Sequence, residues 1–355
     1  MQSIMDVETK YMQRCLQLAL LGDGYTAPNP LVGAVVVHGD TIIGEGFHQH
    51  FGQAHAERNA IFSVKQPELL KNATLYVNLE PCSHYGKTPP CANLIIEKGI
   101  PRVVIGTIDP NPKVSGKGIQ MLKDAGIETY VGVLEEKCRE LNKRFFTFQE
   151  QKRPFIVLKW AQTIDGYIDR IRTNVSEHPL SISNEITRQL THKMRSENQA
   201  IMVSTNTVLL DNPSLTVRNW VGKTPVRITL DRQGRIPQDY HLLDGSVPTL
   251  VFTEIQQPKL ANVEYIQIDF KEEGLQGILK KIFERNIHSV LVEGGAQLLN
   301  SFIAENLWDE ANVEVAPIEI GSGITAPVMT CQPVNRKNFD GHEWLHYYNT
   351  KKTIK

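Results

Sequence analysis

A histidine, a glutamate and two cysteines have the types and spacing of a catalytic metal site. His55 and Glu57 lie two positions apart, and Cys82 and Cys91 follow, with eight residues between them. One imidazole and two thiolates can hold zinc and leave its fourth position to water, as catalytic zinc sites do. Glu57 is not needed as a ligand, so we expect it to carry protons to and from that water. The pattern predicts zinc-dependent hydrolysis.

These residues also match the signature of zinc-dependent nucleobase deaminases, in which His-x-Glu precedes Pro-Cys and a further cysteine. In that signature two residues separate the cysteines, whereas Ser83 to Pro90 separate them here. The alternative is a closed structural zinc site, with His48 or His84 as the fourth ligand. A structural site would leave the glutamate without a purpose, so we expect both histidines to be polar groups at the pocket mouth.

The composition limits the classes of protein that carry this chemistry. The chain has 355 residues, of which 41% are apolar and 22% charged, and its formal net charge is −1. This length suggests two domains, and the lack of basic excess counts against nucleic acid as a partner. Five cysteines without an apolar leader favour a reducing compartment. With no apolar run long enough for a membrane span, we expect a cytoplasmic enzyme that binds no membrane and acts on small molecules.

Strands and helices alternate along both halves of the chain, which predicts two α/β domains, residues 1–147 and 153–355. In the first domain, Cys82 is expected beside a helix that begins at His55. Cys91 is expected to begin another helix, whose dipole favours a thiolate. The predicted strands are 31–37, 41–47, 73–78, 103–108 and 129–133, then 155–160, 200–204, 226–230, 249–252, 289–292 and 344–348; the predicted helices are 7–18, one from 55, 91–98, 117–125, one from 135, 184–195, 275–285 and 296–305.

The first half resembles the deaminase of riboflavin biosynthesis, a family in which a pyrimidine deaminase is fused to a reductase. The resemblance covers about the first 145 residues and implies a cytidine-deaminase-like fold. It implies His55, Cys82 and Cys91 as zinc ligands and Glu57 as proton carrier. We expect the segment Ser83 to Pro90 to contact a phosphorylated ribosylamine. The matching segments are Asn29-Pro30-Leu31-Val32-Gly33, Gly46-Phe47-His48, Gly52 with His55-Ala56-Glu57, Asn78 through Cys91, and Asp109-Pro110-Asn111-Pro112.

Three clusters stand out in the second half: 159–166, Arg195 with 204–218, and 290–296. Taken singly, each has an ordinary explanation: Lys159 and Arg195 as solvated cations, Asp211 as a turn residue, and Gly294-Gly295 as a tight turn. Together the clusters resemble the reductase half of the same family, which is similar to dihydrofolate reductase in fold and uses NADPH. This resemblance covers about residues 153 to 330.

The resemblance implies two sets of contacts in the reductase half. Guanidinium groups suit phosphate because they bind it bidentately, and a glycine turn into a helix N-terminus suits a cofactor phosphate. Arg232 is expected at the 2′-phosphate of NADPH. The implied cofactor contacts are Ala161, Thr207, Asp211, Gly295, Ala296, Gln297, Leu298, Leu299, Asn300 and Ser301; the implied substrate contacts are Lys159, Arg195, Leu215, Arg218 and Glu293.

One segment departs from the family pattern. The family often has Ser-x-Trp-Ile-Thr before the helix that carries the arginine, whereas here the segment from Glu177 to Ser183 has no tryptophan. Ser181 is expected to replace some of its cofactor contacts. If the tryptophan contributes to binding, this reductase binds its cofactor poorly while the deaminase stays intact.

The predicted function is therefore a bifunctional enzyme of riboflavin biosynthesis. Zinc-dependent hydrolytic deamination of 2,5-diamino-6-hydroxy-4-(5-phosphoribosylamino)pyrimidine precedes NADPH-dependent reduction of the ribosyl chain of 5-amino-6-(5-phosphoribosylamino)uracil to ribityl. One rival is a nucleoside or RNA deaminase with a non-catalytic C-terminal binding domain, against which the cysteine spacing counts. The other rival is a non-catalytic scaffold stabilised by zinc. The resemblance also makes a homo-oligomer an expectation.

Overall fold

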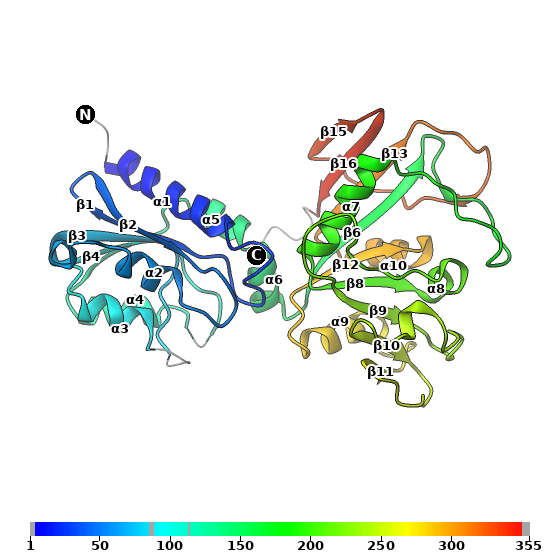
Figure 1. The fold of residues 1–355 in the computed structure, drawn as a ribbon, viewed down its shortest axis with the longest axis horizontal. Coiled ribbons are helices and arrows are strands. Elements are labelled where there is room, and N and C mark those ends of the chain that lie inside the picture. Colours follow the sequence, from blue (N-terminus) through cyan, green and yellow to red (C-terminus); the bar gives the residue numbers. More distant parts are fainter. Residues whose placement is uncertain (1–3, 85–88, 113, 350–355) are drawn as a thin grey trace. The chain divides into compact units, whose positions relative to one another are not determined.

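The structure is a computed structural model that describes residues 4–84, 89–112 and 114–349. The chain divides into two compact units, Met1–Lys152 (unit 1) and Arg153–Lys355 (unit 2) (Figure 1). Each unit combines a sheet, helices and buried hydrophobic clusters, so the expectation of two α/β domains is confirmed. Among the described residues, no helix has both the length and the apolar character needed to span a membrane.

In the described part of unit 1, five strands form one sheet in the order β2-β1-β3-β4-β5. Strand β1 pairs antiparallel with β2 and β3, and β3, β4 and β5 run parallel. The predicted hairpin over residues 31–47 is confirmed as β1 and β2. The elements are α1 (Ile4–Leu20), β1 (Gly33–His38), β2 (Thr41–Phe47), α2 (Ala56–Phe62), the 3-10 helix η1 (Pro67–Asn72), β3 (Ala73–Leu79), α3 (Cys91–Glu97), β4 (Arg102–Thr107), α4 (Lys117–Asp124), β5 (Glu128–Val131), α5 (Glu135–Leu141) and α6 (Lys143–Gln151).

Helices cover both faces of the unit 1 sheet because the side chains of its strands alternate. Val36 and Val77 belong to one buried cluster with residues of α2, α3 and α4. Val35 and Tyr76, each one position away, belong to another cluster with residues of α1 and α5. The ends of α2 and α3 that carry His55 and Cys91 are therefore held against the same face.

In unit 2, the described residues include a sheet of nine strands in the order β11-β10-β9-β8-β12-β6-β13-β16-β15. The strands from β11 to β13 are parallel, and β16 is antiparallel to both β13 and β15. The elements are β6 (Phe155–Thr163), β7 (Tyr167–Asp169), α7 (Glu185–Glu197), β8 (Ala200–Ser204), α8 (Thr205–Asp211), β9 (Val226–Leu230), the 3-10 helix η2 (His241–Leu243), β10 (Thr249–Thr253), β11 (Val263–Gln267), α9 (Gly274–Phe283), β12 (Ser289–Gly294), α10 (Ala296–Ala304), β13 (Glu310–Ala316), β14 (Ile324–Thr325), β15 (Asn335–Phe339) and β16 (His342–Tyr348).

The two faces of this sheet are also covered by different helices. Leu158 and Val292 pack in a cluster with residues of α9 and α10. Ile201 and Val203 pack in another cluster that includes Val208 of α8. Helices α8 and α10 begin directly after the carboxyl ends of β8 and β12. Ligands commonly bind at this edge of an α/β sheet.

The structure differs from the expected elements in several places. The helix predicted from Glu135 is two helices, because Asn142 interrupts it and turns its side chain to the backbone of Leu31. The elements that the sequence analysis did not name are η1, β7, α8, η2, β11, β13, β14 and β15.

Candidate metal centre and ligand cavity

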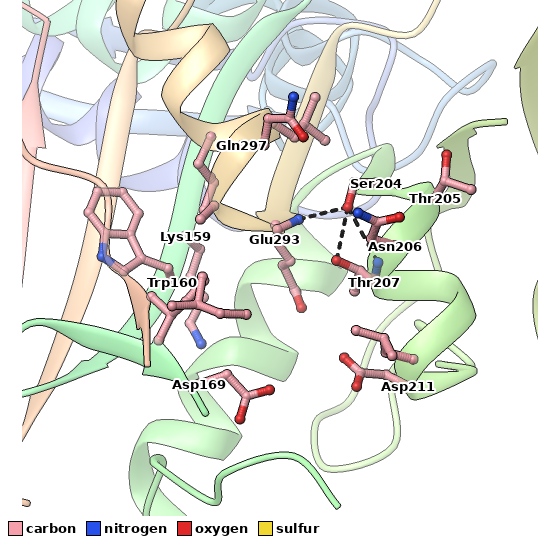
Figure 2. A pocket seen from close by; sticks show the side chains of 18 of the residues that line it. Lys159, Trp160, Asp169, Ser204, Thr205, Asn206, Thr207, Asp211, Glu293 and Gln297 are labelled. Carbon is pink, nitrogen blue, oxygen red and sulfur yellow. Dashed lines mark hydrogen bonds between the residues drawn. The ribbon is translucent and has the colours of Figure 1, made fainter. Parts of the chain in front are cut away.

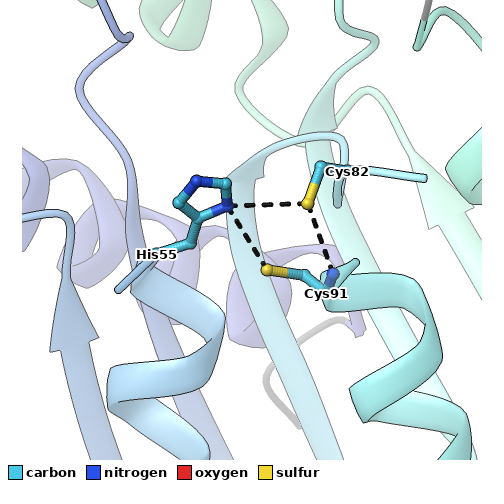
Figure 3. A group of neighbouring side chains, drawn as sticks. All are labelled: His55, Cys82 and Cys91. Atoms are coloured by element: carbon cyan, nitrogen blue, oxygen red, sulfur yellow. Dashed lines mark hydrogen bonds between the residues drawn. The ribbon is translucent and has the colours of Figure 1, made fainter. Parts of the chain in front are cut away.

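Three side chains that can bind a metal converge in unit 1 (Figure 3). His55 is the N-cap of α2, Cys82 follows the end of β3, and Cys91 is the first residue of α3. Nδ1 of His55 lies 3.5 Å from the Sγ atoms of both cysteines. In a tetrahedral zinc site, the usual bond lengths put a sulfur and a nitrogen ligand about 3.6 Å apart. The donor types and their spacing therefore fit zinc.

The two thiols are not equivalent. The hydrogen bond with Cys91, supported by His55, lowers the pKa of the Cys82 thiol. The same hydrogen bond and burial raise the pKa of the Cys91 thiol. The backbone N–H of Cys91 also donates to Sγ of Cys82 over 3.3 Å. One thiolate is thus favoured before the other, and thiolate is the form that binds a metal.

Neither histidine considered as a fourth ligand joins the group within the described residues. His48 is 2% exposed, and its Nδ1 and Nε2 atoms are each 3.1 Å from a partner, Ala54 O and Asn29 Nδ2 respectively. Its ring meets that of His55 edge-on, with centroids 5.4 Å apart. Burial lowers the pKa of His48, which favours the neutral ring. His48 therefore supports the ring of His55, and His84 is exposed.

Glu57 lies in the first turn of α2 and is 3% exposed. Burial raises the pKa of the Glu57 carboxyl to about 7; Cys82 adds to the effect, whereas His55 and Cys91 oppose it. The carboxyl thus interacts with all three candidate ligands. A buried carboxyl beside the candidate metal ligands is placed to accept a proton from water and to return it, which is what hydrolysis of an amine needs.

Glu80, which the sequence analysis did not use, fixes the segment that carries Cys82. One carboxylate oxygen accepts the backbone N–H groups of Asp109 and Gly116, over 3.2 and 2.9 Å. The other accepts those of Gly118 and Ile119, over 3.0 and 3.2 Å. Glycine is required at position 118 because a Cβ there would lie 2.0 Å from the carbonyl oxygen of Pro81. The first turn of α4 therefore packs directly against the segment leading to Cys82.

The longer segment between the cysteines is described only in part. Tyr85, Gly86, Lys87 and Thr88 lie outside the described residues. The expectation that this segment contacts a phosphorylated ribosylamine therefore stays a prediction.

Unit 2 contains a cavity of about 1070 Å³ at the carboxyl ends of β8, β9 and β12 (Figure 2). Two residues implied by the resemblance do not line it. Leu215 is buried in a cluster with Ile201 and Val208, and Asn300 is an exposed residue of α10. The implied residues that line the cavity are Lys159, Ala161, Ser181, Arg195, Thr207, Asp211, Arg218, Arg232, Glu293, Gly295, Ala296, Gln297, Leu298, Leu299 and Ser301.

The hydroxyl group of Ser204 joins two helix starts at the cavity (Figure 2). Its Oγ accepts the N–H of Gly295 over 3.1 Å and that of Thr207 over 3.4 Å. Ser204 is the N-cap of α8, and Gly295 is the N-cap of α10. Gly294 has φ 129°, a conformation that favours glycine. The first turn of α10, with its positive dipole end, is held at the cavity wall and suits an anionic ligand.

Arg195 and Glu293 form a two-bond ion pair in the cavity wall. Nε and Nη2 of Arg195 donate to the two carboxylate oxygens of Glu293 over 2.8 and 2.7 Å, and Nη1 donates to the carbonyl of Thr216. Burial opposes ionisation of Glu293, but Arg195 outweighs it and lowers the pKa of that carboxyl. Lys159, on neighbouring strand β6, is 8% exposed, and burial lowers its pKa. The wall is therefore charged and already ordered.

Several cavity residues were missed by the sequence analysis. Arg235 donates to Asn206 over 3.3 Å. It lies three positions after Arg232, and both arginines follow the end of β9. Their spacing could have indicated that both line the same cavity. Arg172 pairs with Asp169, three positions earlier, and with Asp211. It was not recognisable as a cavity residue, because Asp211 is distant in the sequence. The additional charged or polar lining residues are Asp169, Arg172, Ser183, Arg188, Thr191, His192, Ser204, Thr205, Asn206, Arg235 and Glu305.

Comparison with known families matches both units. The model described as the cytidine and deoxycytidylate deaminase zinc-binding region matches residues 5–107. The model described as the RibD C-terminal domain matches residues 154–349. The two matches include the candidate zinc ligands and the cavity.

Similar proteins extend over nearly the whole chain. The riboflavin biosynthesis protein RibD of Aquifex aeolicus (strain VF5) is 44% identical over 327 residues, which cover 91% of this chain and 90% of that protein. RibD of Bacillus amyloliquefaciens is 42% identical over 330 residues, covering 90% and 87%.

Solved structures agree with these matches. The crystal structure of a diaminohydroxyphosphoribosylaminopyrimidine deaminase/5-amino-6-(5-phosphoribosylamino)uracil reductase from Thermotoga maritima has a TM-score of 0.85 and 38% identity, and the match covers 97% of this chain and 99% of that one. A structure of Acinetobacter baumannii RibD has a TM-score of 0.85 and 32% identity, with the same coverage.

Proposed function

The chain belongs to the RibD family of bifunctional riboflavin-biosynthesis enzymes, which have a deaminase and a reductase domain, and we propose that unit 1 is its deaminase and unit 2 its reductase. The proposed domains, residues 1–147 and 153–355, correspond to a cytidine-deaminase-like fold and a dihydrofolate-reductase-like fold. The observation that carries the proposal is the presence in one chain of a His-Cys-Cys group beside a buried glutamate and of a large charged cavity.

For the deaminase, we propose that His55, Cys82 and Cys91 would hold zinc, which would supply a water with a lowered pKa. Glu57 would hold the proton that water gives up and pass it to the departing amine. The amine leaves 2,5-diamino-6-hydroxy-4-(5-phosphoribosylamino)pyrimidine as ammonia, and a carbonyl oxygen replaces it. The burial of Glu57 among the three ligands supports this role.

For the reductase, we propose that the unit 2 cavity would hold NADPH, which would supply the hydride that reduces the ribosyl chain of 5-amino-6-(5-phosphoribosylamino)uracil, in its imine form, to ribityl. Lys159 lies near the reacting carbon, and Arg195 and Arg218 receive the substrate phosphate. The first turn of α10 would hold the cofactor phosphates, and Arg232 would bind the 2′-phosphate. The support is that these groups line a single cavity.

The direct test is to supply purified protein with the diaminopyrimidine and with cytidine in parallel. We expect ammonia only from the diaminopyrimidine, and we expect oxidation of NADPH, measured by its absorbance, once the deaminated product is present. Ammonia from cytidine, without NADPH oxidation, would instead support a nucleoside deaminase with a binding domain. The match of residues 154–349 to the RibD C-terminal domain favours the first outcome.

Replacing Arg195 with alanine should raise the KM for the phosphoribosyl substrate by about 30-fold or more, because it removes a charge and leaves Glu293 buried and unpaired. The measurement is the rate of NADPH oxidation against substrate concentration. Arg285→Ala is the matched control, since Arg285 pairs with Glu264 away from the cavity. An unchanged KM would remove Arg195 from the phosphate site.

We further propose that the partners are small molecules alone and that the enzyme works in the cytoplasm as a homo-oligomer. The net charge of −1 supports the absence of nucleic acid, and the five free cysteines support a reducing compartment. Light scattering of the purified protein measures the oligomeric state.

A further inference from the structure

Arg172 is a largely buried arginine in the wall of the unit 2 cavity. Its side chain is 5% exposed and lies between two carboxylates. Nε donates to Oδ2 of Asp169 over 2.7 Å, and Nη2 donates to Oδ1 of Asp211 over 2.5 Å. Nη1 donates to the carbonyl oxygens of Glu177 and Leu210. These contacts join the chain after β7 to the end of α8.

The contacts also order the segment that leads to Ser181. Asp169 is 9% exposed, and its Oδ1 accepts the backbone N–H groups of Arg170 and Leu180, over 2.8 and 2.9 Å. Both ends of the segment from Arg170 to Leu180 are therefore bound to one carboxylate, whose other oxygen binds Arg172. Ser181 follows this segment directly and lines the cavity.

Asp211 differs from Asp169 because only one of its carboxylate oxygens accepts a hydrogen bond. Within the part of the chain that the structure describes, Oδ1 accepts from Arg172 and Oδ2 has no partner. The carboxylate lines the cavity (Figure 2). A carboxylate with one oxygen held by an arginine keeps a fixed acceptor for a ligand hydroxyl.

We propose that Arg172 is a positioning residue of the reductase, which orients Asp211 toward a ribose hydroxyl of NADPH and orders the cavity wall ahead of Ser181. The inference rests on the proposed function of unit 2. Arg172 also offsets one of two negative charges that would otherwise face a cofactor with several phosphate charges. No atom of Arg172 needs to contact the cofactor.

The test is a double-mutant cycle on the full chain, with the dissociation constant of NADPH measured by fluorescence titration. Arg172→Gln should weaken NADPH binding by about tenfold, the size of coupling that contacting charged residues show. In an Asp211→Asn background the same change should cost clearly less, because Arg172 then has no carboxylate at position 211 to orient and only its contact with Asp169 is lost. In kinetics, the KM for NADPH should rise while that for the phosphoribosyl substrate stays unchanged.

Arg170→Gln is the matched control, because Arg170 belongs to the same segment, is exposed and does not line the cavity. It should leave NADPH binding unchanged. Arg172→Lys serves if the glutamine variant does not fold, since an ammonium cannot bridge both carboxylates as a guanidinium does, and it too should weaken binding.

Unchanged NADPH binding in a folded Arg172 variant overturns the inference. So does an equal loss in both backgrounds, which would show that Arg172 does not act through Asp211. A wild-type chain that fails to bind NADPH removes the proposed function of unit 2 itself. Ammonia release by unit 1 reports that each variant is intact outside the reductase.

Discussion

Replacing Glu57 with glutamine should reduce ammonia release by about a hundredfold to ten thousandfold, the usual contribution of general acid–base catalysis. The zinc content should not change, because Glu57 is not one of the three converging ligands. Glutamine keeps the size of the side chain in a position that is 3% exposed but cannot carry the proton. The measurements are the rate of ammonia release and the zinc-to-protein ratio.

Glu45→Gln is a suitable control, since Glu45 belongs to unit 1 but is partly exposed and paired with Arg14. It should leave both measurements unchanged. Full ammonia release by the Glu57 variant would mean that another group carries the proton. Loss of zinc would mean that Glu57 is a ligand.

Replacing Cys91 with serine should remove both zinc and ammonia release while NADPH oxidation on the deaminated substrate continues. A serine hydroxyl does not ionise as a thiol does, so zinc would keep only His55 and Cys82. The loss of zinc affinity should exceed the roughly 10- to 100-fold that losing an outer-shell partner causes. The measurements are metal content and the two activities on the same preparation.

Cys331→Ser tests whether the effect belongs to the metal site. Cys331 is a free, partly buried cysteine of unit 2 that does not join the His55 group. This variant should keep its zinc. If Cys91→Ser also kept a full equivalent of zinc, the proposed ligand set would be wrong. If it lost NADPH oxidation as well, the two activities would not be independent.

Apolar periodicity predicted much of the fold, and it failed where polar residues are buried. Strand β13 carries Glu310, Asn312 and Glu314, which do not resemble a central strand. Glu314 is fully buried because Ser183, Thr187 and His342 hydrogen-bond to it. Such partners come from distant parts of the chain, so no local pattern reveals them.

In the candidate sites, too, local sequence patterns predicted some features and missed those that depend on the fold. The convergence of His55, Cys82 and Cys91 was predictable because metal ligation requires particular residue types at short spacing; their role as zinc ligands stays a prediction. The run from Gly295 to Ser301 was taken as one contact segment, but Asn300 is exposed, since consecutive residues of a helix point in different directions. Leu215 has φ 53° and its side chain is buried in a core cluster, which the resemblance did not indicate.

The carboxylate of Glu80 accepts hydrogen bonds from four backbone N–H groups, and these bonds restrict insertions and deletions in the stretch that donates them. Moving the stretch from Asp109 to Ile119 by even one residue would leave buried amides without an acceptor, at about 1 to 3 kcal/mol for each. The described residues of this stretch, 109–112 and 114–119, are therefore fixed in position relative to Glu80. Sequence change near the candidate metal centre should therefore fall outside the residues that bond to Glu80.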